Sequence, residues 1–183
     1  SSIWMLRPRC SLISARTPAT LLADVPSVFV TPTGEFAPVN FDRTCRGPVL
    51  ARHALACSLN IPAVRLLDEL GGPAPLHERL RACGLTTLDR PPEHYGLGLT
   101  LGNAEVRLLE LANAYACLAR LGEYRPLRMF EDLPPTGSRR LFDVRAAWLL
   151  ADVLSDNSAR ASAFGLDSSL RFDFRVACKT GTS

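Results

Sequence analysis

The chain has 183 residues, of which 47% are hydrophobic, and it carries a formal net charge of +3. This length suits one domain or a large piece of one, and the apolar fraction supplies a core and argues against disorder. The arginines are scattered along the chain, with Arg139-Arg140 as the only adjacent pair. Without a basic stripe or an interleaved aromatic ladder, nucleic acid is excluded as an expected partner.

Cysteine and histidine spacing predicts neither a metal site nor a cofactor site. Six cysteines occur without any Cys-x-x-Cys pair, and three histidines stand far apart (Cys10, Cys45, Cys57, Cys83, Cys117, Cys178, His53, His77, His94). Such residues are typical of small buried thiols and surface imidazoles. In an oxidising compartment a disulfide stays open as an alternative, and the sequence does not pair the thiols.

The first 50 residues carry mostly turn signals. Residues 1–17 have no clear period, and Thr17-Pro18 predicts the start of a short helix that runs through Leu22. Residues 25–40 are expected to be strand or loop, because three prolines and a glycine interrupt them. No apolar run reaches the length of a membrane span, and no signal peptide is visible, so the chain is expected to be a segment of a longer protein.

Helical signals then dominate as far as residue 154. The spacing predicts helices over 49–57, 60–70, 76–83, 104–121 and 144–154. Three of them begin after a residue that favours the N-cap, namely Asn60, Asn103 and Asp143. Glycines close several of the helices, and residues 124–129 and 133–138 are expected to be a short extended piece and a loop.

The C-terminal tail has a different period. Phe172, Phe174 and Val176 alternate with polar or small residues, which predicts a half-buried strand that leads into Lys179. The predicted fold class is therefore α+β, in three parts: an irregular end over 1–17, a mainly helical part over 18–170, and a strand of an antiparallel sheet over 171–183.

Lys179 is the only lysine among 21 basic residues, and it opens a Lys-Thr-Gly-Thr run. A lysine offers a compact ammonium whose pKa can be tuned by burial, which arginine cannot replace. Lys179 with the hydroxyls of Thr180 and Thr182 would suit a carboxylate, and Gly181 leaves room for a substrate backbone. The alternative is an exposed strand end without function.

Ser58-Leu59-Asn60 forms a Ser-x-Asn motif, and Asn60 lies 119 positions before Lys179. In a functional interpretation Ser58 shuttles protons and the Asn60 amide orients a substrate carbonyl. The structural alternative makes Asn60 a plain helix cap, and the two roles compete.

These motifs occur in order with three further segments, over residues 12 to 183. The set consists of Pro38-Val39-Asn40-Phe41-Asp42 with Gly47-Pro48-Val49, then Ser58-Leu59-Asn60-Ile61-Pro62-Ala63-Val64, Leu101-Gly102-Asn103 with Glu105-Val106, Leu111-Ala112-Asn113-Ala114-Tyr115, and the terminal run. It resembles the transpeptidase domain of class A penicillin-binding proteins, and in particular the 1C subgroup. An ordered set is far more specific than any one motif.

The resemblance implies a β-lactamase/transpeptidase-like fold. It also implies a parent protein that cross-links peptidoglycan stem peptides through an acyl-serine and that carries a glycosyltransferase domain as well. β-Lactams would acylate the same serine. It implies that Ser58 and Lys179 are catalytic and relay protons. Asn60, Thr180, Gly181 and Thr182 would bind substrate, with Lys179 and Thr182 at the terminal carboxylate. The parent would act at the periplasmic face of the bacterial inner membrane, held by an N-terminal anchor that this chain lacks.

The chain departs from that family at its nucleophile. The Ser-x-x-Lys motif is absent, since the residue three before Lys179 is Val176. Ser1 and Ser2 stand near the expected place, but Trp4 and Met5 lie three positions further on. Either the chain begins after the nucleophile or this end is altered, for example by a frameshift. We therefore expect the chain alone to be inactive as a transpeptidase.

Two other classes of protein are compatible with the sequence. The chain is alternatively a catalytically dead remnant or interaction module that keeps the helices, or, with less support, part of a serine β-lactamase or D-Ala-D-Ala carboxypeptidase. The upstream reading frame discriminates: an in-frame Ser-x-x-Lys with a glycosyltransferase domain restores the enzyme, and a stop codon supports the remnant.

Overall fold

A computed structural model describes residues 16–32, 34–130, 132, 134 and 137–181. Helices are the main regular elements of this part of the chain, together with three small two-stranded antiparallel sheets. Of the irregular end expected over residues 1–17, residues 1–15 lie outside the described residues, as do Thr182 and Ser183. None of the described helices combines the length and the apolar character that a membrane span requires.

The first sheet replaces a helix that the sequence predicted. Strand β1 (Leu21–Asp24) pairs antiparallel with β4 (Gly47–Leu50), so that Leu21 lies opposite Leu50. The expected helix from Thr17 through Leu22 is wrong, because residues 17–20 form a turn closed by the Thr20 amide on the Thr17 carbonyl at 3.0 Å. Leu22 then points into the core from the strand.

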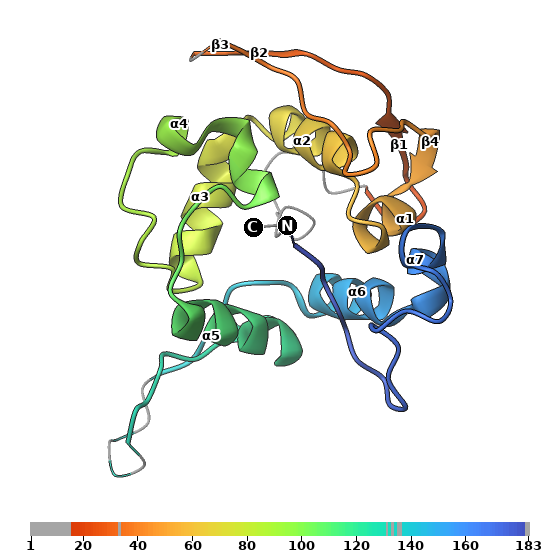
Figure 1. Ribbon diagram of the computed structural model, residues 1–183. Coiled ribbons are helices and arrows are strands. Elements are labelled where there is room, and N and C mark those ends of the chain that lie inside the picture. The colour runs from red at the N-terminus through yellow and green to blue at the C-terminus, as the bar shows by residue number, and fades with distance from the viewer. Residues whose placement is uncertain (1–15, 33, 131, 133, 135–136, 182–183) are drawn as a thin grey trace.

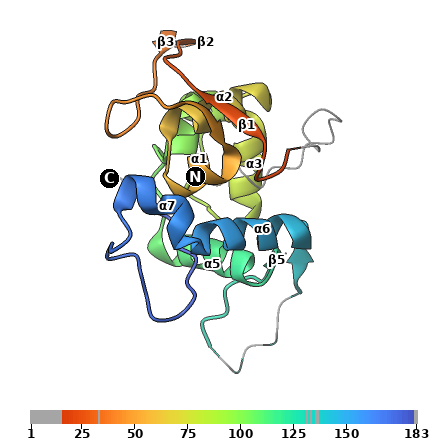
Figure 2. The same ribbon diagram turned by 90° about the vertical axis from the view of Figure 1, so that its right-hand side faces the viewer.

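The other two sheets lie at the edge of the molecule. Strand β2 (Phe29–Thr31) pairs with β3 (Gly34–Phe36) in a hairpin that projects beyond the helices (Figures 1 and 2). Strand β5 (Glu123–Tyr124) pairs with β6 (Arg139–Arg140). Pairs this short are not stable without packing against the helices.

The helices surround the middle of the molecule in Figure 1. In chain order they are α1 (Ala51–Ala56), α2 (Asn60–Glu69), α3 (Pro73–Ala82), α4 (Pro92–Tyr95), the 3-10 helix η2 (Gly96–Leu101), α5 (Leu108–Ala119), α6 (Val144–Ser155) and α7 (Asn157–Phe164). The helices predicted near 49–57, 60–70, 76–83 and 144–154 are confirmed, with shifted starts at α1 and α3. Helix α7 was not predicted, because its sequence has a weak apolar period.

The core consists of three apolar clusters. The largest surrounds α2 and η2 and includes Val64, Leu67 and Leu88, each with no measurable exposure. A second joins Leu55, Cys83, Cys117, Phe142 and Val153 from five parts of the chain. A third packs Leu22, Ala54 and Leu59 between β1, α1 and the segment that follows α1. Each buried Leu or Val side chain contributes about 2 kcal/mol of transfer free energy.

Helix α5 starts later than its sequence period predicts. Asn103 does not cap a helix, because its Nδ2 donates to the Tyr95 carbonyl at 2.8 Å, and Arg107 is the residue that precedes the helix. The helix ends at Ala119, two residues before the expected end at Leu121, and Gly122 follows in the turn. A Cβ on Gly122 would lie 2.4 Å from the Phe142 carbonyl oxygen, and its φ is +91°, so only glycine fits there.

Helix α6 confirms the cap that its sequence predicts. The Asp143 carboxylate accepts the Arg145 and Ala146 amides at 3.0 and 3.4 Å. Asp156, which ends α6, performs the same role for α7 by accepting the Ala159 amide at 3.1 Å. A side-chain cap of this type is worth about 1 kcal/mol.

The tail forms no strand over residues 171–181, so the strand expected over 172–176 is wrong. Phe174 is 70% exposed, and no described strand pairs with this segment. Alternation alone cannot hold a strand, since its backbone groups need a partner. The tail is held instead by a hydrogen bond from the Cys178 amide to the Leu154 carbonyl at 2.9 Å. The observed class is thus mixed helix with small antiparallel sheets.

Candidate functional site

Ser58 lies at a sharp reversal between α1 and α2. Its φ is +58°, in the left-handed region that favours glycine. The Ser58 amide donates to the Leu55 carbonyl at 3.2 Å, and the Leu59 amide donates to the Ala54 carbonyl at 2.9 Å. These two bonds are the Schellman pattern that closes a helix, and Ala54 and Leu59 supply its apolar contact. The end of α1 therefore fixes the serine backbone.

Asn40 caps α2 from a distance. Its Oδ1 accepts the Asn60 amide at 2.9 Å and the Ile61 amide at 3.4 Å. Its Nδ2 donates to Asp24 Oδ1 at 2.8 Å and to the Thr44 carbonyl, also at 2.8 Å. Asn40 is 3% exposed and Asp24 is fully buried. One buried amide thereby connects β1 to the helix that follows Ser58.

Asn60 is the first residue of α2 and not its side-chain cap, so the alternative of a plain cap is wrong. Its Nδ2 donates to the Val39 carbonyl at 2.8 Å. The sequence motifs predict no role for Asn40 or Asp24. The only signal was that Asn40 belongs to the Pro38–Asp42 segment of the resemblance, because a contact across 16 residues has no periodic pattern.

Lys179 comes to Ser58 from the far end of the chain. Its Nζ lies 2.6 Å from Ser58 Oγ and 2.6 Å from the Thr180 carbonyl oxygen. No ion pair among the described residues involves Lys179. Burial without a carboxylate partner lowers the pKa of Lys179 to about 8. This amine therefore exchanges protons near physiological pH.

A cavity of about 1060 Å³ opens beside this pair. The predicted site residues that line it are Ser58, Asn60, Lys179, Thr180 and Gly181, whereas Thr182 lies outside the described residues. Cys57 and Ser162 share the wall, and their side chains lie 3.2 Å apart. The structure thus brings together two motifs that are more than 100 residues apart in the sequence.

Apart from Lys179, the charged side chains of the cavity wall lie on the loop before β4. They are Asp42, Arg43 and Arg46, and Arg46 Nη2 pairs with Asp42 Oδ2 at 2.6 Å. Hydrogen bonds from Thr44 and Arg46 lower the pKa of Asp42. Together with Lys179 the wall has a net positive charge, which suits an anionic ligand.

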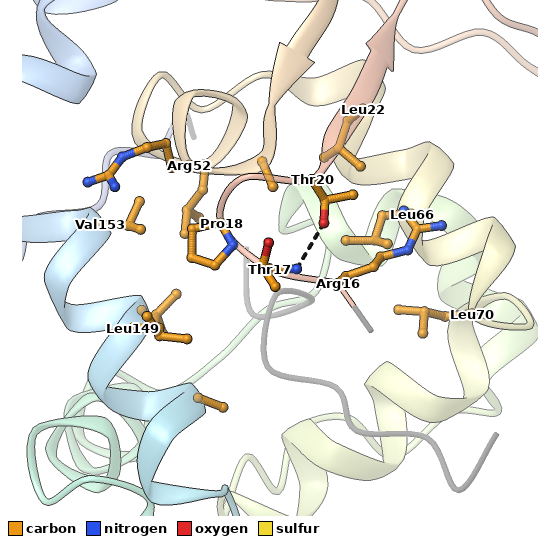
Figure 3. Close-up of a pocket in the computed structure, with 14 residues that line it drawn as sticks. Arg16, Thr17, Pro18, Thr20, Leu22, Arg52, Leu66, Leu70, Leu149 and Val153 are labelled. Atoms are coloured by element: carbon orange, nitrogen blue, oxygen red, sulfur yellow. Dashed lines mark hydrogen bonds between the residues drawn. The ribbon is translucent and has the colours of Figure 1, made fainter. Parts of the chain in front are cut away.

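A second, smaller cavity is separate from the predicted site. Its volume is about 150 Å³, and Figure 3 shows its lining from the first turn, α1, α2 and α6. Leu66, Leu70, Leu149 and Val153 give it an apolar wall, and the Thr17 amide bonds to Thr20 Oγ1 at 2.9 Å beside it. None of the predicted site residues lines it, so we do not assign it to the same site.

The cysteines and histidines do not form a metal site in the described part of the chain. Cys45, Cys57, Cys83, Cys117 and Cys178 are free thiols. Burial raises the pKa of Cys83 to about 12, and burial also raises the pKa of Cys117. Such thiols are poor nucleophiles at neutral pH.

Sequence relatives of this chain are penicillin-binding proteins. Penicillin-binding protein 1C of Escherichia coli is 37% identical over 166 residues, which are 91% of this chain and 20% of the relative. Penicillin-binding protein 1A of Aquifex aeolicus is 38% identical over 88 residues, which are 48% of this chain and 11% of the relative. No protein-family model matches the chain.

Three solved structures have a similar fold. Penicillin-binding protein 1A from Haemophilus influenzae covers 87% of this chain and 28% of its own, with a TM-score of 0.63 and 22% identity. A peptidoglycan glycosyltransferase from Burkholderia ambifaria covers 76% and 48%, with a TM-score of 0.59 and 19% identity. The TP domain of Burkholderia pseudomallei penicillin-binding protein 3 covers 76% and 46%, with a TM-score of 0.57 and 21% identity.

These similarities relate the chain to class A penicillin-binding proteins. The chain spans about a fifth of the length of the Escherichia coli relative and about a tenth of that of the Aquifex aeolicus relative. At 19 to 22% identity the similarity to the solved structures indicates the fold alone.

Proposed function

We propose that this chain is part of the D,D-transpeptidase region of a penicillin-binding protein, and that its large cavity receives the D-Ala-D-Ala end of a peptidoglycan stem peptide. One observation carries the proposal: Lys179 Nζ lies 2.6 Å from Ser58 Oγ across 121 residues of sequence, on the wall of a cavity that also includes Asn60. Sequence similarity to penicillin-binding protein 1C supports it.

In this function the three polar side chains divide the work. Lys179 binds the terminal carboxylate of the peptide, and its ammonium is stabilised when that carboxylate replaces water. Asn60 orients the penultimate amide through its side chain. Ser58 passes a proton between Lys179 and the reacting groups. The parent would act in the periplasm and would also bind β-lactams.

Peptide binding tests this function without requiring turnover. We expect a diacetyl-lysyl peptide ending in D-Ala-D-Ala to shift the backbone ¹H–¹⁵N signals of Asn60 and Lys179 in a saturable way, and an L-Ala-L-Ala peptide to shift them far less. Lys179→Met should weaken the binding about 10-fold or more, since a charge-assisted hydrogen bond is lost. Arg171→Ala is the control, because Arg171 pairs with Asp167 away from the cavity.

Equal shifts with both peptides, or unchanged affinity in Lys179→Met, would overturn the proposal.

The second candidate is glycosyl transfer, since one solved neighbour is described as a peptidoglycan glycosyltransferase. Glycosyl transfer needs carboxylates that act as acid and base at the sugar bond. Asp42 is the carboxylate on the wall of the large cavity, and Arg46 neutralises it. The assay is polymerisation of a lipid-linked disaccharide pentapeptide. Product formation that Asp42→Asn abolishes and Lys179→Met leaves intact would favour this candidate over the transpeptidase.

A further inference from the structure

We propose that Ser58 and Lys179 form a serine–lysine dyad in which Ser58 Oγ is itself a nucleophile toward neutral, activated acyl donors such as aryl esters. This activity goes beyond peptide binding and does not depend on it. A serine next to a base within hydrogen-bond reach is the minimum arrangement for nucleophilic acyl transfer, and lysine serves as that base in several unrelated enzymes. The distance of 2.6 Å between Oγ and Nζ meets that requirement.

The backbone presents the serine in the way that suits a nucleophile. Ser58 is the αL residue of a helix-closing turn, with φ at +58°. This conformation is an ordinary way for a helix to end, and here the sharp turn places the Ser58 side chain at the cavity wall. Here the bonds of Ser58 and Leu59 to the end of α1 determine the turn, and the hydroxyl lies on the wall of the large cavity.

Lys179 is held in an orientation that fits a base. A neutral amine has two N–H groups and one lone pair. In the structure Nζ donates to Ser58 Oγ and to the Thr180 carbonyl oxygen, each at 2.6 Å. In the neutral amine one N–H keeps the Thr180 bond, and the lone pair can turn to the Ser58 hydroxyl and accept its proton. With a pKa of about 8, about a tenth of the lysine is neutral at pH 7, which is far more than for an exposed lysine.

The reaction balances with water as the only co-reactant. Ser58 Oγ attacks the ester carbonyl while its proton moves to Lys179 Nζ, and the aryl oxide leaves as the C–O bond breaks. The acyl-Ser58 ester is then attacked by water. Lys179, having lost its proton to solvent or to the leaving group, accepts the water proton, and Oγ recovers a proton as the second C–O bond breaks. No oxidant, metal or cofactor takes part.

The charge of the acyl donor determines whether the dyad works. A carboxylate in the cavity would form an ion pair with Lys179 as an ammonium, raise its pKa and remove the base. Neutral esters do not have this effect. The dyad should therefore hydrolyse p-nitrophenyl acetate, and peptides with a free C-terminal carboxylate that occupy the cavity should inhibit that reaction.

A fluorophosphonate probe and an ester assay test the dyad directly. We expect the probe to form one adduct on the peptide that contains Ser58, with loss of fluoride. Ser58→Ala and Lys179→Met should lower kcat/KM for p-nitrophenyl acetate about 100-fold, in the range that general-base catalysis supplies. Ser58→Gly serves beside Ser58→Ala, because glycine fits the positive φ and keeps the fold. Ser162→Ala is the matched control, a hydroxyl on the same wall that bonds to Cys57.

The pH profile separates a base from a structural lysine. We expect kcat/KM of the wild type to rise with pH and to level off above an apparent pKa of about 8. The other titratable side chains on the wall are Asp42, Arg43, Arg46, Cys57 and Tyr115, and we expect none of them to replace that step in Lys179→Met. Labelling at Ser162, hydrolysis that survives Ser58→Gly, or an unchanged pH profile in Lys179→Met would each overturn the dyad, whether or not stem peptides bind.

Discussion

At the scale of single residues, Lys179 has a charge that its surroundings do not compensate. Burial lowers its pKa from 10.5 to about 8, so the folded chain holds fewer protons on this group than the unfolded chain between those two values. The free energy of unfolding therefore rises with pH across that interval. Below pH 8 both states are protonated and the destabilisation is complete.

Replacing Lys179 with methionine should remove this dependence. We expect the unfolding free energy of the wild type, relative to Lys179→Met, to rise by about 1–3 kcal/mol between pH 7 and pH 10.5, since each pKa unit corresponds to about 1.4 kcal/mol. Urea unfolding in reducing buffer at several pH values measures the difference between the two proteins. Parallel curves would show that burial does not shift this lysine.

At the scale of elements, Asn40 is the residue on which the start of α2 depends. It accepts two helix amides and donates to the fully buried Asp24. Asn40→Ala would leave a buried carboxylate and two amides without that partner. We expect a loss of about 3 kcal/mol in urea unfolding, because unpaired buried polar groups are costly. Asn113→Ala removes an exposed hydrogen bond from the side-chain amide to the Arg125 carbonyl, and it should cost less than about 1 kcal/mol. Similar losses for both variants would refute the special role of Asn40.

Helix α6, the segment at Asn103 and the tail show which features the sequence predicts and which it does not. Helix α6 and its Asp143 cap follow from local chemistry, because the cap and the amides that it accepts are two and three residues apart. Asn103 has the same local signal but bonds to the Tyr95 carbonyl, so a tertiary contact overrides the cap. The tail near Phe174 has the period of a strand, and no described strand pairs with it.

The site shows the same limit. The sequence motifs identify Ser58, Asn60 and Lys179, and the structure places all three on one wall. They do not identify Asn40 or Asp24, whose contacts join β1, a loop and α2. Nor do they predict the positive φ of Ser58, because serine has no local preference for it.

At the scale of the whole molecule, the site exists only when the tail folds back onto the helices. In Figure 1 the dark blue segment passes α6 and returns toward the middle of the molecule. Arg175 fixes it there, with Nη2 2.8 Å from Asp152 Oδ1 and Nε 2.9 Å from Ser155 Oγ. Lys179 reaches Ser58 just beyond this attachment.

Loosening that attachment should weaken the site while the core stays intact. We expect Arg175→Ala to raise amide exchange in residues 171–181 about fivefold and to lower ester hydrolysis by a similar factor, since an exposed charged pair contributes up to about 1 kcal/mol. The unfolding midpoint of the helices should hardly move. Arg171→Ala is the matched control, because Arg171 pairs with Asp167 in its own segment and does not join the tail to α6. If Arg175→Ala changed exchange in the tail but left hydrolysis untouched, Lys179 would not depend on the docked tail, and the dyad would need another base.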